Sequence, residues 1–422
     1  MKSFFFNSIM ILLSPNMYLC EDNDVEEYTE QIILCGFKIS DISGDENFFN
    51  KHKSPIERCD KILFSGFSYN IYRLGNLEVQ GPQGGGSGLQ NYLKRTADLL
   101  ELDESDIYIM IEIKRLRYIT SIGYDEVIDR CKKMASSIIQ NWKNLVIEID
   151  NYLFNDSQDL EAIIGCLEII VGKTSRPVKI FTRPTIMKIV YDNLSDILKR
   201  KKVIVDFVII DYNRNDIMPL DYVPLMNAYN SNEIYREKDM SFHLEFLSSL
   251  ELDMAKFAFS FELCARPYCS FYRPNQKAAP NEYKIEPFKT EIHTEECMRQ
   301  YRRSHVPILY INLVEAYGAL IKNGISVLFE NYGNSTLSYV IPSYSDDHIS
   351  FVVYENEESL HLKTKEARKA KFQNVFVDDM QCSYHLDGPM HFHRFKAIID
   401  AMNEKELKKR SIIQNLRVKK RI

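Results

Sequence analysis

The chain has 422 residues, of which 45% are hydrophobic and 27% are charged, and its formal net charge is −6. This length allows two or three domains, although a single α/β barrel also reaches it. The acidic balance excludes the strongly basic surface that is typical of nucleic-acid-binding proteins. The composition therefore indicates a globular protein with a large hydrophobic core and no nucleic-acid partner.

The N-terminus has the pattern of a secretory signal. Lys2 is followed by an apolar run over residues 4–13 and then by Ser14 and Pro15. The run is shorter than the roughly 20 residues of a membrane-spanning helix, whereas a basic residue before a short apolar stretch is typical of a signal peptide. We predict a signal peptide over residues 1–20 and a secreted, extracellular protein without a membrane span. A buried N-terminal strand is the alternative.

Short apolar runs, several nearly continuous in Val, Ile and Leu, recur along the chain with helical patterns between them. Continuous runs of this kind are typical of strands buried on both faces of a parallel sheet. The helical pattern, with apolar residues at i, i+3, i+4 and i+7, is clear over 125–142 and 157–171. The alternation predicts an α/β fold, either a (β/α)₈ TIM barrel or a doubly wound sheet. The predicted strands are Gln31–Cys35, Lys61–Phe67, Ile107–Ile113, Leu145–Ile149, Val178–Phe181, Val203–Ile210, Ala255–Phe261 and Asn374–Val377.

One interval is too long for a single helix and its loops. Phe261 and Asn374 are 374 − 261 = 113 positions apart, and β-like runs lie between them. We predict a small α+β lobe over 267–346, inserted between strands 7 and 8 of a barrel domain that covers 28–403. Helices over 359–371 and 391–402 complete this barrel. Residues 404–422 form a basic tail, which is a solvated end or a contact for an anionic surface.

Candidate chemistry centres on the fourth predicted strand. Side chains alternate along a strand, so Val146, Glu148, Asp150 and Tyr152 share one face. Two carboxylates at the C-terminal end of a barrel strand lie where barrel enzymes have their active sites. The alternative is that both carboxylates are satisfied by hydrogen bonds inside the barrel and do no chemistry.

This strand resembles that of the glycoside hydrolase family 18 chitinases, which carry D-G-x-D-x-D-x-E there. Placing Asp150 on the last aspartate puts Glu148 on the middle one and Tyr152 on the catalytic glutamate. A slip of two residues puts Asp150 at the glutamate position. A slip of one residue turns the carboxylates outward. Neither of the two registers keeps the glutamate.

Three further segments carry the resemblance, which extends over about 31–402. Val205–Asn213 resembles the family's sixth strand and its M-x-Y-D ending, with Tyr212 and Asn213 in place of the tyrosine and aspartate. Lys256–Arg266 resembles the seventh strand, where only Arg266 of the ending is kept. Ser350–Ser359, with Lys363 and the strand at 374–377, resembles the family's ending, and Asp378 stands where the family has a sugar-floor tryptophan. The resemblance implies ligand contacts from Tyr212, Asn213, Arg266 and Asp378.

The resemblance implies substrate-assisted chemistry, in which the substrate's N-acetyl oxygen attacks the anomeric carbon and the glutamate protonates the leaving oxygen. A tyrosine, with a pKa near ~10, is a far weaker acid. We therefore predict a chitinase-like pseudoenzyme that binds a chitin-type oligosaccharide or another glycan, or a protein partner, and needs no cofactor or metal. One alternative is a working glycosidase whose acid is Glu148, Glu112 or Glu262. The other is a structural or interaction protein with no sugar site.

The chain has nine cysteines and no C-x-x-C pair. Cys35 and Cys59 lie 59 − 35 = 24 positions apart, near the ends of adjacent strands, and the family resemblance implies a cysteine pair at this place. We predict that they form a disulfide, worth about 3 kcal/mol in the chain-entropy model. N-glycosylation sequons occur at Asn155, Asn193 and Asn334, and Asn155 is expected on the rim where the strands end.

Overall fold

The computed structural model describes thirteen stretches of the chain, which belong to the unit Ile32–Ile422 apart from Gln31. The predicted signal peptide, most of the inserted lobe and the basic tail lie outside the described residues. The stretches are 31–39, 48–51, 53–70, 78–79, 87–114, 123–138, 144–212, 240–263, 266–271, 326–332, 335–341, 348–382 and 393–404.

Eight parallel strands form a closed barrel. They follow the order β1-β13-β8-β7-β6-β5-β4-β2, and the pairing of β1 with β2 closes the ring. A short strand, β3 (Glu78–Val79), adds to β2 in the antiparallel direction. All eight predicted strands are present, so the TIM barrel is confirmed over the doubly wound sheet. The strands are β1 (Ile33–Lys38), β2 (Lys61–Asn70), β4 (Ile107–Lys114), β5 (Leu145–Glu148), β6 (Val178–Thr182), β7 (Val205–Ile210), β8 (Phe257–Glu262) and β13 (Asn374–Asp378).

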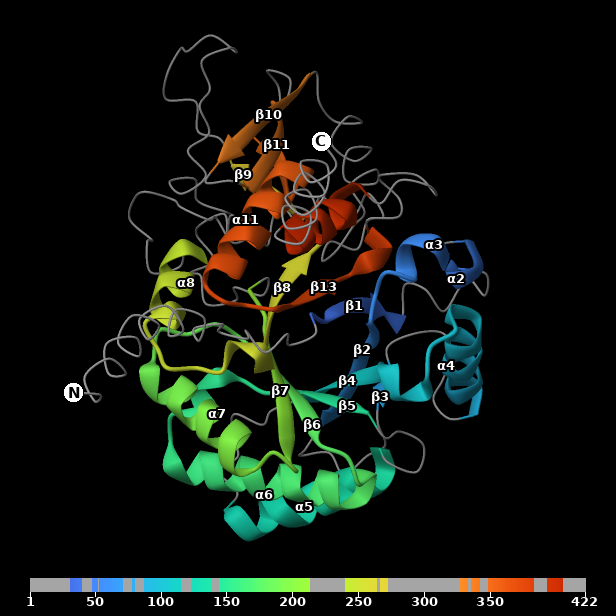
Figure 1. The fold of residues 1–422 in the computed structure, drawn as a ribbon, viewed down its shortest axis with the longest axis vertical. Coiled ribbons are helices and arrows are strands. Elements are labelled where there is room, and N and C mark those ends of the chain that lie inside the picture. Colours follow the sequence, from blue (N-terminus) through green and yellow to red (C-terminus); the bar gives the residue numbers. More distant parts are fainter. Residues whose placement is uncertain are drawn as a thin grey trace, which may run out of the picture. The chain divides into compact units, whose positions relative to one another are not determined.

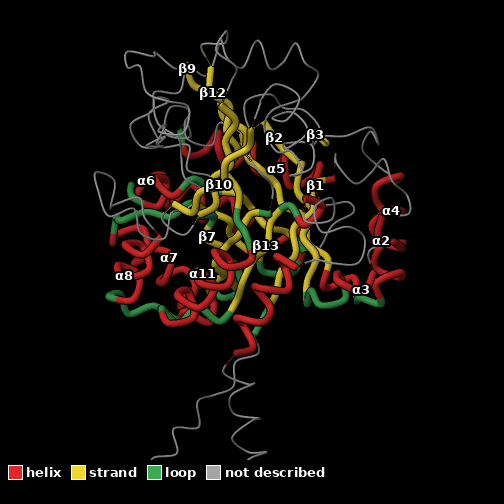
Figure 2. The backbone as a smooth tube through the Cα atoms, turned by 90° about the horizontal axis from the view of Figure 1, so that it is seen from above, coloured by secondary structure: helices red, strands yellow, loops and turns green. Residues whose placement is uncertain are grey.

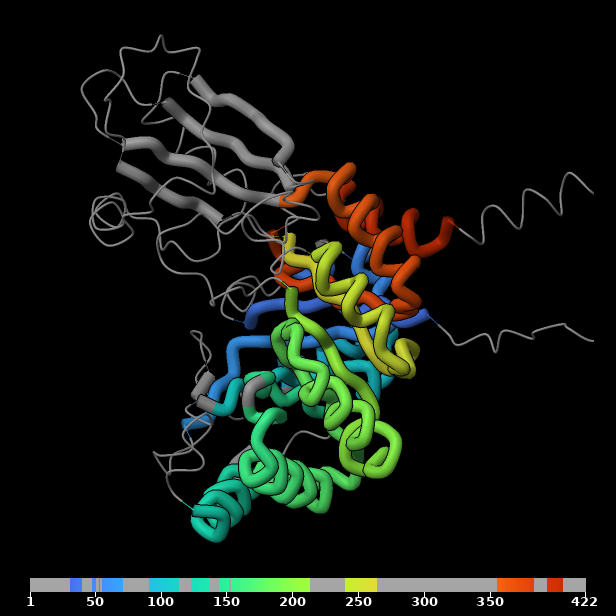
Figure 3. Tube along the Cα trace, turned by 90° about the vertical axis from the view of Figure 1, so that its left-hand side faces the viewer, coloured from blue at the N-terminus to red at the C-terminus, as the bar shows by residue number. Residues whose placement is uncertain are grey.

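Helices follow the strands and surround the barrel (Figures 1 and 2). The two clear helical patterns of the sequence correspond to α5 and α6. Successive helices from α5 to α8 follow one another around the barrel, in the cyan-to-yellow part of Figure 3. The helices are α2 (Phe48–Lys51), α3 (Lys53–Ile56), α4 (Ser87–Leu100), α5 (Tyr124–Ile138), α6 (Ser157–Thr174), α7 (Lys188–Arg200), α8 (Met240–Ser248), α11 (Glu357–Lys369) and a last helix over 393–404, with 3₁₀ turns η1 (Glu104–Asp106), η3 (Asn151–Phe154) and η5 (Met254–Lys256).

Strand alternation divides the buried side chains into two sets. One set packs against the helices and forms the outer layer of the core. The other set, here called the inner cluster, comes from alternate strand positions and fills the barrel. Within it, the rings of Phe181 and Phe376 meet edge to face with centroids 5.8 Å apart. The inner cluster consists of Leu34, Leu63, Tyr108, Met110, Val146, Phe181, Phe207, Ile209, Ala258 and Phe376.

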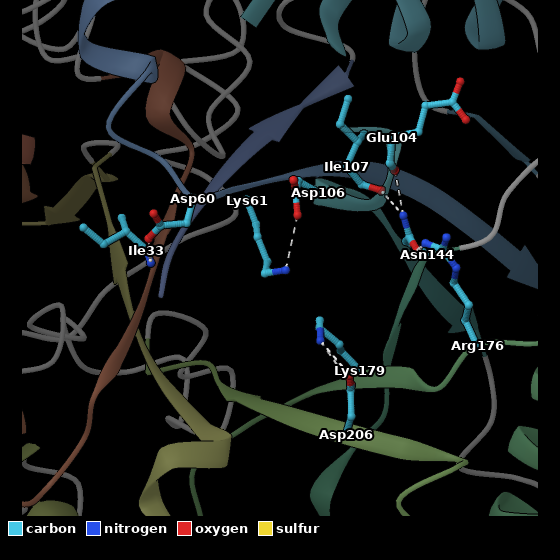
Figure 4. Close-up of polar contacts among 10 residues, drawn as sticks. All are labelled: Ile33, Asp60, Lys61, Glu104, Asp106, Ile107, Asn144, Arg176, Lys179 and Asp206. Carbon is cyan, nitrogen blue, oxygen red and sulfur yellow. Dashed lines mark hydrogen bonds and ion pairs between the residues drawn. The ribbon is translucent and has the colours of Figure 1, made fainter. Parts of the chain in front are cut away.

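Polar contacts join neighbouring strands at the N-terminal end of the barrel (Figure 4). The buried Lys179 ammonium pairs with Asp206 at 3.1 Å and lies 5.0 Å from the centre of the Tyr108 ring. Lys61 lies over the same ring at 5.5 Å and contacts Asp106 at 3.5 Å. Ion pairs and cation–π contacts thus close this end, which in TIM barrels serves stability rather than catalysis.

A four-stranded antiparallel sheet lies in the chain between β8 and β13, as predicted for the inserted lobe. Its order is β10-β11-β12-β9, and its strands are β9 (Arg266–Phe271), β10 (Ser326–Tyr332), β11 (Ser335–Ile341) and β12 (His348–Tyr354). The sheet extends beyond the predicted 267–346 at both ends.

A buried polar cluster holds the return from this sheet to the barrel. Arg394 donates to the backbone carbonyls of Leu263 at 2.8 Å and Glu355 at 3.3 Å. The Glu355 carboxylate pairs with Lys363, whose side chain is fully buried, and accepts a hydrogen bond of 2.6 Å from Ser359. Ser359 and Asn356 form the capping box of α11. The helix predicted over 359–371 is therefore present as α11, and its N-cap is Asn356, with Ser359 at the third helical position.

Two disulfides link described elements. Cys35 and Cys59 are bonded with Cα atoms 5.8 Å apart, which confirms the predicted pair. A second bond, which the sequence reasoning did not predict, joins Cys131 of α5 to Cys166 of α6. Gly165 beside it permits the close approach of the two helices, because an added Cβ would lie 2.7 Å from Ile128 Cδ1.

Candidate active site

Acidic side chains gather at the C-terminal end of the barrel. Glu112 of β4 and Glu148 of β5 are register partners on neighbouring strands. Each lies two positions beyond a member of the inner cluster, Met110 and Val146 respectively, so both face the interior. Both side chains are half-buried. Two carboxylates of adjacent strands therefore stand side by side at the end where barrel enzymes have their active sites.

A second carboxylate pair comes from two strands later in the sequence, β8 and β13. Glu262 of β8 and Asp378 of β13 are register partners, and both are buried. Gly36 of β1 makes room for this pair, because a Cβ there would lie 2.7 Å from Asp378 Oδ1. Asp378 also accepts a hydrogen bond of 2.9 Å from the backbone of Asp379. Asp378 thus lies at the C-terminal end of the barrel, where β13 ends.

β5 ends at Glu148, and the chain turns away after Ile149, whose backbone N–H donates to the Phe181 carbonyl of β6 at 2.9 Å. Residues Asn151–Phe154 form η3, so the alternation expected from Val146 to Tyr152 extends only as far as Glu148. The Asn151 amide donates to the carbonyls of Arg183 at 3.3 Å and Pro184 at 3.0 Å, which favours this turn over a longer strand. Tyr152 lies on the turn rather than on the strand. The last carboxylate on the strand itself is Glu148.

Asp150 takes part in a contact between the two loops that follow β5 and β6. Its Oδ1 lies 3.9 Å from Arg183 Nε, and both side chains are partly exposed. The positive guanidinium beside Asp150 opposes its negative charge at this rim. A partly exposed pair at this distance contributes little to stability, on the order of 1 kcal/mol or less.

The other predicted ligand contacts lie in different places. Tyr212 belongs to the outer layer, where its buried ring stacks on Phe259 with centroids 4.3 Å apart. Burial raises the pKa of Tyr212 well above its usual value. Tyr212 therefore packs in the outer layer, and the ligand contact that the family resemblance implies for it stays a prediction. Asn213 and the side chain of Arg266, the first residue of β9, lie outside the described residues.

The inward position next to Tyr212 is taken by Asp211, which the sequence reasoning missed. Asp211 follows Ile209 of the inner cluster by two residues and is buried. Its Oδ1 accepts a hydrogen bond of 3.3 Å from Ser260 Oγ. The cause is a register shift near the start of β7, between the pairs Val178–Val205 and Lys179–Phe207, which leaves Asp206 out of the ladder. The sequence carries no clear signal of this irregularity.

The sequons also differ in their surroundings. Asn155 is exposed, in the turn between η3 and α6, on the side at which β5 ends, which is the placement predicted for it. Asn193 is half-buried on α7 and donates to the carbonyl of Phe154 at 2.7 Å. Asn334 lies outside the described residues.

Carboxylates and hydroxyls at the end of a barrel can accept hydrogen bonds from sugar hydroxyl and amide groups, and a protonated carboxyl can donate a proton to a leaving oxygen. Within the described stretches, no three His, Cys, Asp or Glu side chains are grouped so that they could hold a metal ion. No helix in these stretches is long and apolar enough to cross a membrane.

Comparison with known proteins gives a result at the level of structure. No model of a known protein family matches the chain, and no curated protein sequence does. Among solved structures, the chain is similar to a family 18 chitinase from Cycas revoluta in complex with (GlcNAc)₃, with a TM-score of 0.57, 12% identity, and coverage of 88% of this chain and 99% of that one.

It is also similar to a family 18 N-acetylglucosaminidase from Paenibacillus barengoltzii, with a TM-score of 0.54, 11% identity, and coverage of 88% and 100%. The spore cortex-lytic enzyme SleL of Bacillus megaterium gives a TM-score of 0.53 at 12% identity, with coverage of 88% and 74%. The chain therefore has the chitinase-like barrel fold of the glycoside hydrolase family 18 proteins.

Proposed function

We propose that this protein is a secreted, chitinase-like barrel that binds a chitin-type oligosaccharide at the C-terminal end of its strands without hydrolysing it. The observation that carries the proposal is the position of Glu112, Glu148, Glu262 and Asp378. They provide hydrogen-bond acceptors at the end where barrel proteins bind ligands, in the fold of a chitinase that is itself seen with (GlcNAc)₃.

Two features favour binding without hydrolysis. Asp150, the next carboxylate after Glu148, follows the strand instead of extending it and lies beside Arg183. Asp378 stands where the sequence resemblance implies a sugar-floor tryptophan, and an aspartate offers no ring for stacking. The described aromatic side chains of the inner cluster are buried in the packed interior. A sugar at this end would therefore be held mainly by polar contacts.

A second candidate function, hydrolysis with Glu148 as the acid, is favoured by one specific observation. β5 ends at Glu148, which faces the interior beside Glu112. A carboxyl group at the end of a strand is well placed to protonate a leaving oxygen. The two candidates make the same binding prediction and differ in turnover.

Two disulfides support the secreted location. Cys35–Cys59 and Cys131–Cys166 join buried cysteines. Structural disulfides persist in oxidising compartments and are rare in the cytosol. A protein partner in place of a glycan remains the third reading, and the experiment below separates it from the first two.

The proposal is tested by isothermal titration of the purified protein with chito-oligosaccharides and, as a specificity control, cello-oligosaccharides. Glu112→Ala should weaken chito-oligosaccharide binding by roughly 10-fold or more, because a hydrogen bond to a charged group contributes about 1.5–3 kcal/mol. Asp106→Ala is the matched control and should leave binding unchanged, because Asp106 ends η1 just before the N-terminal end of the same strand, where it pairs with Lys61. If the wild-type protein binds no chito-oligosaccharide, the proposal is wrong.

A further inference from the structure

Asn155 lies in an open turn that is held in place from both sides. After it, Asp156 caps α6 by accepting hydrogen bonds from the backbone N–H groups of Gln158 at 2.8 Å and Asp159 at 3.2 Å. Before it, Leu153 and Phe154 are buried in the outer layer. The asparagine between these anchors is exposed, and so is Ser157, the third residue of the sequon. The turn therefore presents a complete sequon at the surface.

Asn193 is in the opposite situation. It belongs to the middle of α7, its Nδ2 donates to the Phe154 carbonyl at 2.7 Å, and Ser195 of the same sequon is buried. N-glycosylation attaches the sugar to this same Nδ2 atom. A glycan there would have to fit between α7 and η3 and disturb the bond to Phe154. That bond fixes the residue directly before Asn155, so Asn193 acts as a positioning residue for the turn.

We propose that Asn155 carries an N-linked glycan in the secreted protein and that Asn193 does not. The inference stands on the geometry of the two sequons and rests on the secreted location proposed above, and it does not depend on sugar binding by the barrel. It is consistent with the two buried disulfides, since the compartment in which disulfides form also modifies exposed sequons. The chemical class of the modification is an oligosaccharide joined through N-acetylglucosamine to the asparagine amide.

The experiment is expression of the full chain through the secretory pathway of a eukaryotic cell, followed by enzymatic removal of N-glycans in H₂¹⁸O and peptide mass mapping. Release in labelled water converts an occupied asparagine to ¹⁸O-aspartate, which assigns each sequon separately. We expect the label at Asn155 and an unchanged asparagine at Asn193.

Two substitutions make the assignment independent of folding effects. Ser157→Ala removes the first sequon while leaving Asn155 in place, and it should lower the intact mass by one glycan. Ser195→Ala removes the second sequon while keeping the Asn193–Phe154 bond, and it should leave the glycan mass unchanged. An unmodified Asn155, or a label at Asn193, would overturn the proposal.

Discussion

The buried histidine of α8 should make the protein less stable in mild acid. His243 is buried and its ring lies 5.8 Å from that of Tyr212. Burial lowers its pKa from 6.5 to about 4, and a hydrogen bond with the backbone of Thr185 opposes this effect only in part. A protonated imidazole is disfavoured here because the packed layer offers it little solvation.

The direction and size of the effect follow from linkage between protonation and folding. In the unfolded chain His243 binds a proton near pH 6.5, and in the folded chain only near pH 4. The unfolded state therefore binds more protons within this window, so the free energy of unfolding falls as the pH falls from 6.5 towards 4. The pKa difference between the two states is about 2.5, and each pKa unit corresponds to 1.36 kcal/mol. The free energy of unfolding therefore falls by about 3 kcal/mol, and the whole loss is reached below about pH 4.

The measurement is urea unfolding, followed by circular dichroism, at several pH values between 4 and 7.5. His243→Phe keeps an aromatic ring in the outer layer and removes the titrating group. Between pH 7.5 and pH 4, its free energy of unfolding should therefore fall by about 3 kcal/mol less than that of the wild type. His361→Gln, a half-buried histidine on α11, is the control and should follow the wild type. Parallel curves for wild type and His243→Phe would refute the reasoning.

Four further variants test the packing around two glycines, a disulfide and a buried ion pair. Gly36→Ala should destabilise the protein by about 1–3 kcal/mol, because the new Cβ would meet buried side chains of β13. Gly172→Ala on α6 should stabilise it by about 0.5–1 kcal/mol, because the new Cβ meets nothing within 4 Å. Equal melting temperatures for the two variants would contradict this account. Replacing Cys131 and Cys166 by serine opens a loop of 35 positions and should cost about 4 kcal/mol in denaturant unfolding, so a loss below 1 kcal/mol would contradict the entropic account. Lys363→Met leaves its buried carboxylate partner unpaired and should cost about 3–5 kcal/mol, and the account fails if the midpoint in urea does not move.

Much of the barrel could be predicted because its strands are buried on both faces and appear as continuous apolar runs. The Cys35–Cys59 bond was predictable for a related reason, since adjacent parallel strands bring those residues together. Cys131 and Cys166 gave a weaker signal. Cys131 lies on the apolar stripe of its helix, and nothing in the sequence shows that α5 and α6 pack closely enough for a bond.

The candidate site was less predictable because it depends on where strands end and shift. The end of β5 is decided by Asn151, whose amide binds carbonyls 32 and 33 residues away in the sequence. In β7 the register shift at Asp206 reverses the alternation, so that Asp211 faces inward and Tyr212 outward. Both effects come from contacts between distant segments, which local periodicity does not report.

Turnover of a chromogenic chito-oligosaccharide by the purified wild-type protein, measured together with its binding, tests the central claim most directly. Loss of a general acid alone lowers a rate by about 10²–10⁴-fold. We predict saturable binding with no hydrolysis above that of a Glu148→Gln, Asp150→Asn variant. Hydrolysis by the wild type that disappears in this variant would contradict the account and assign the chain as a working glycosidase whose acid is Glu148 or Asp150.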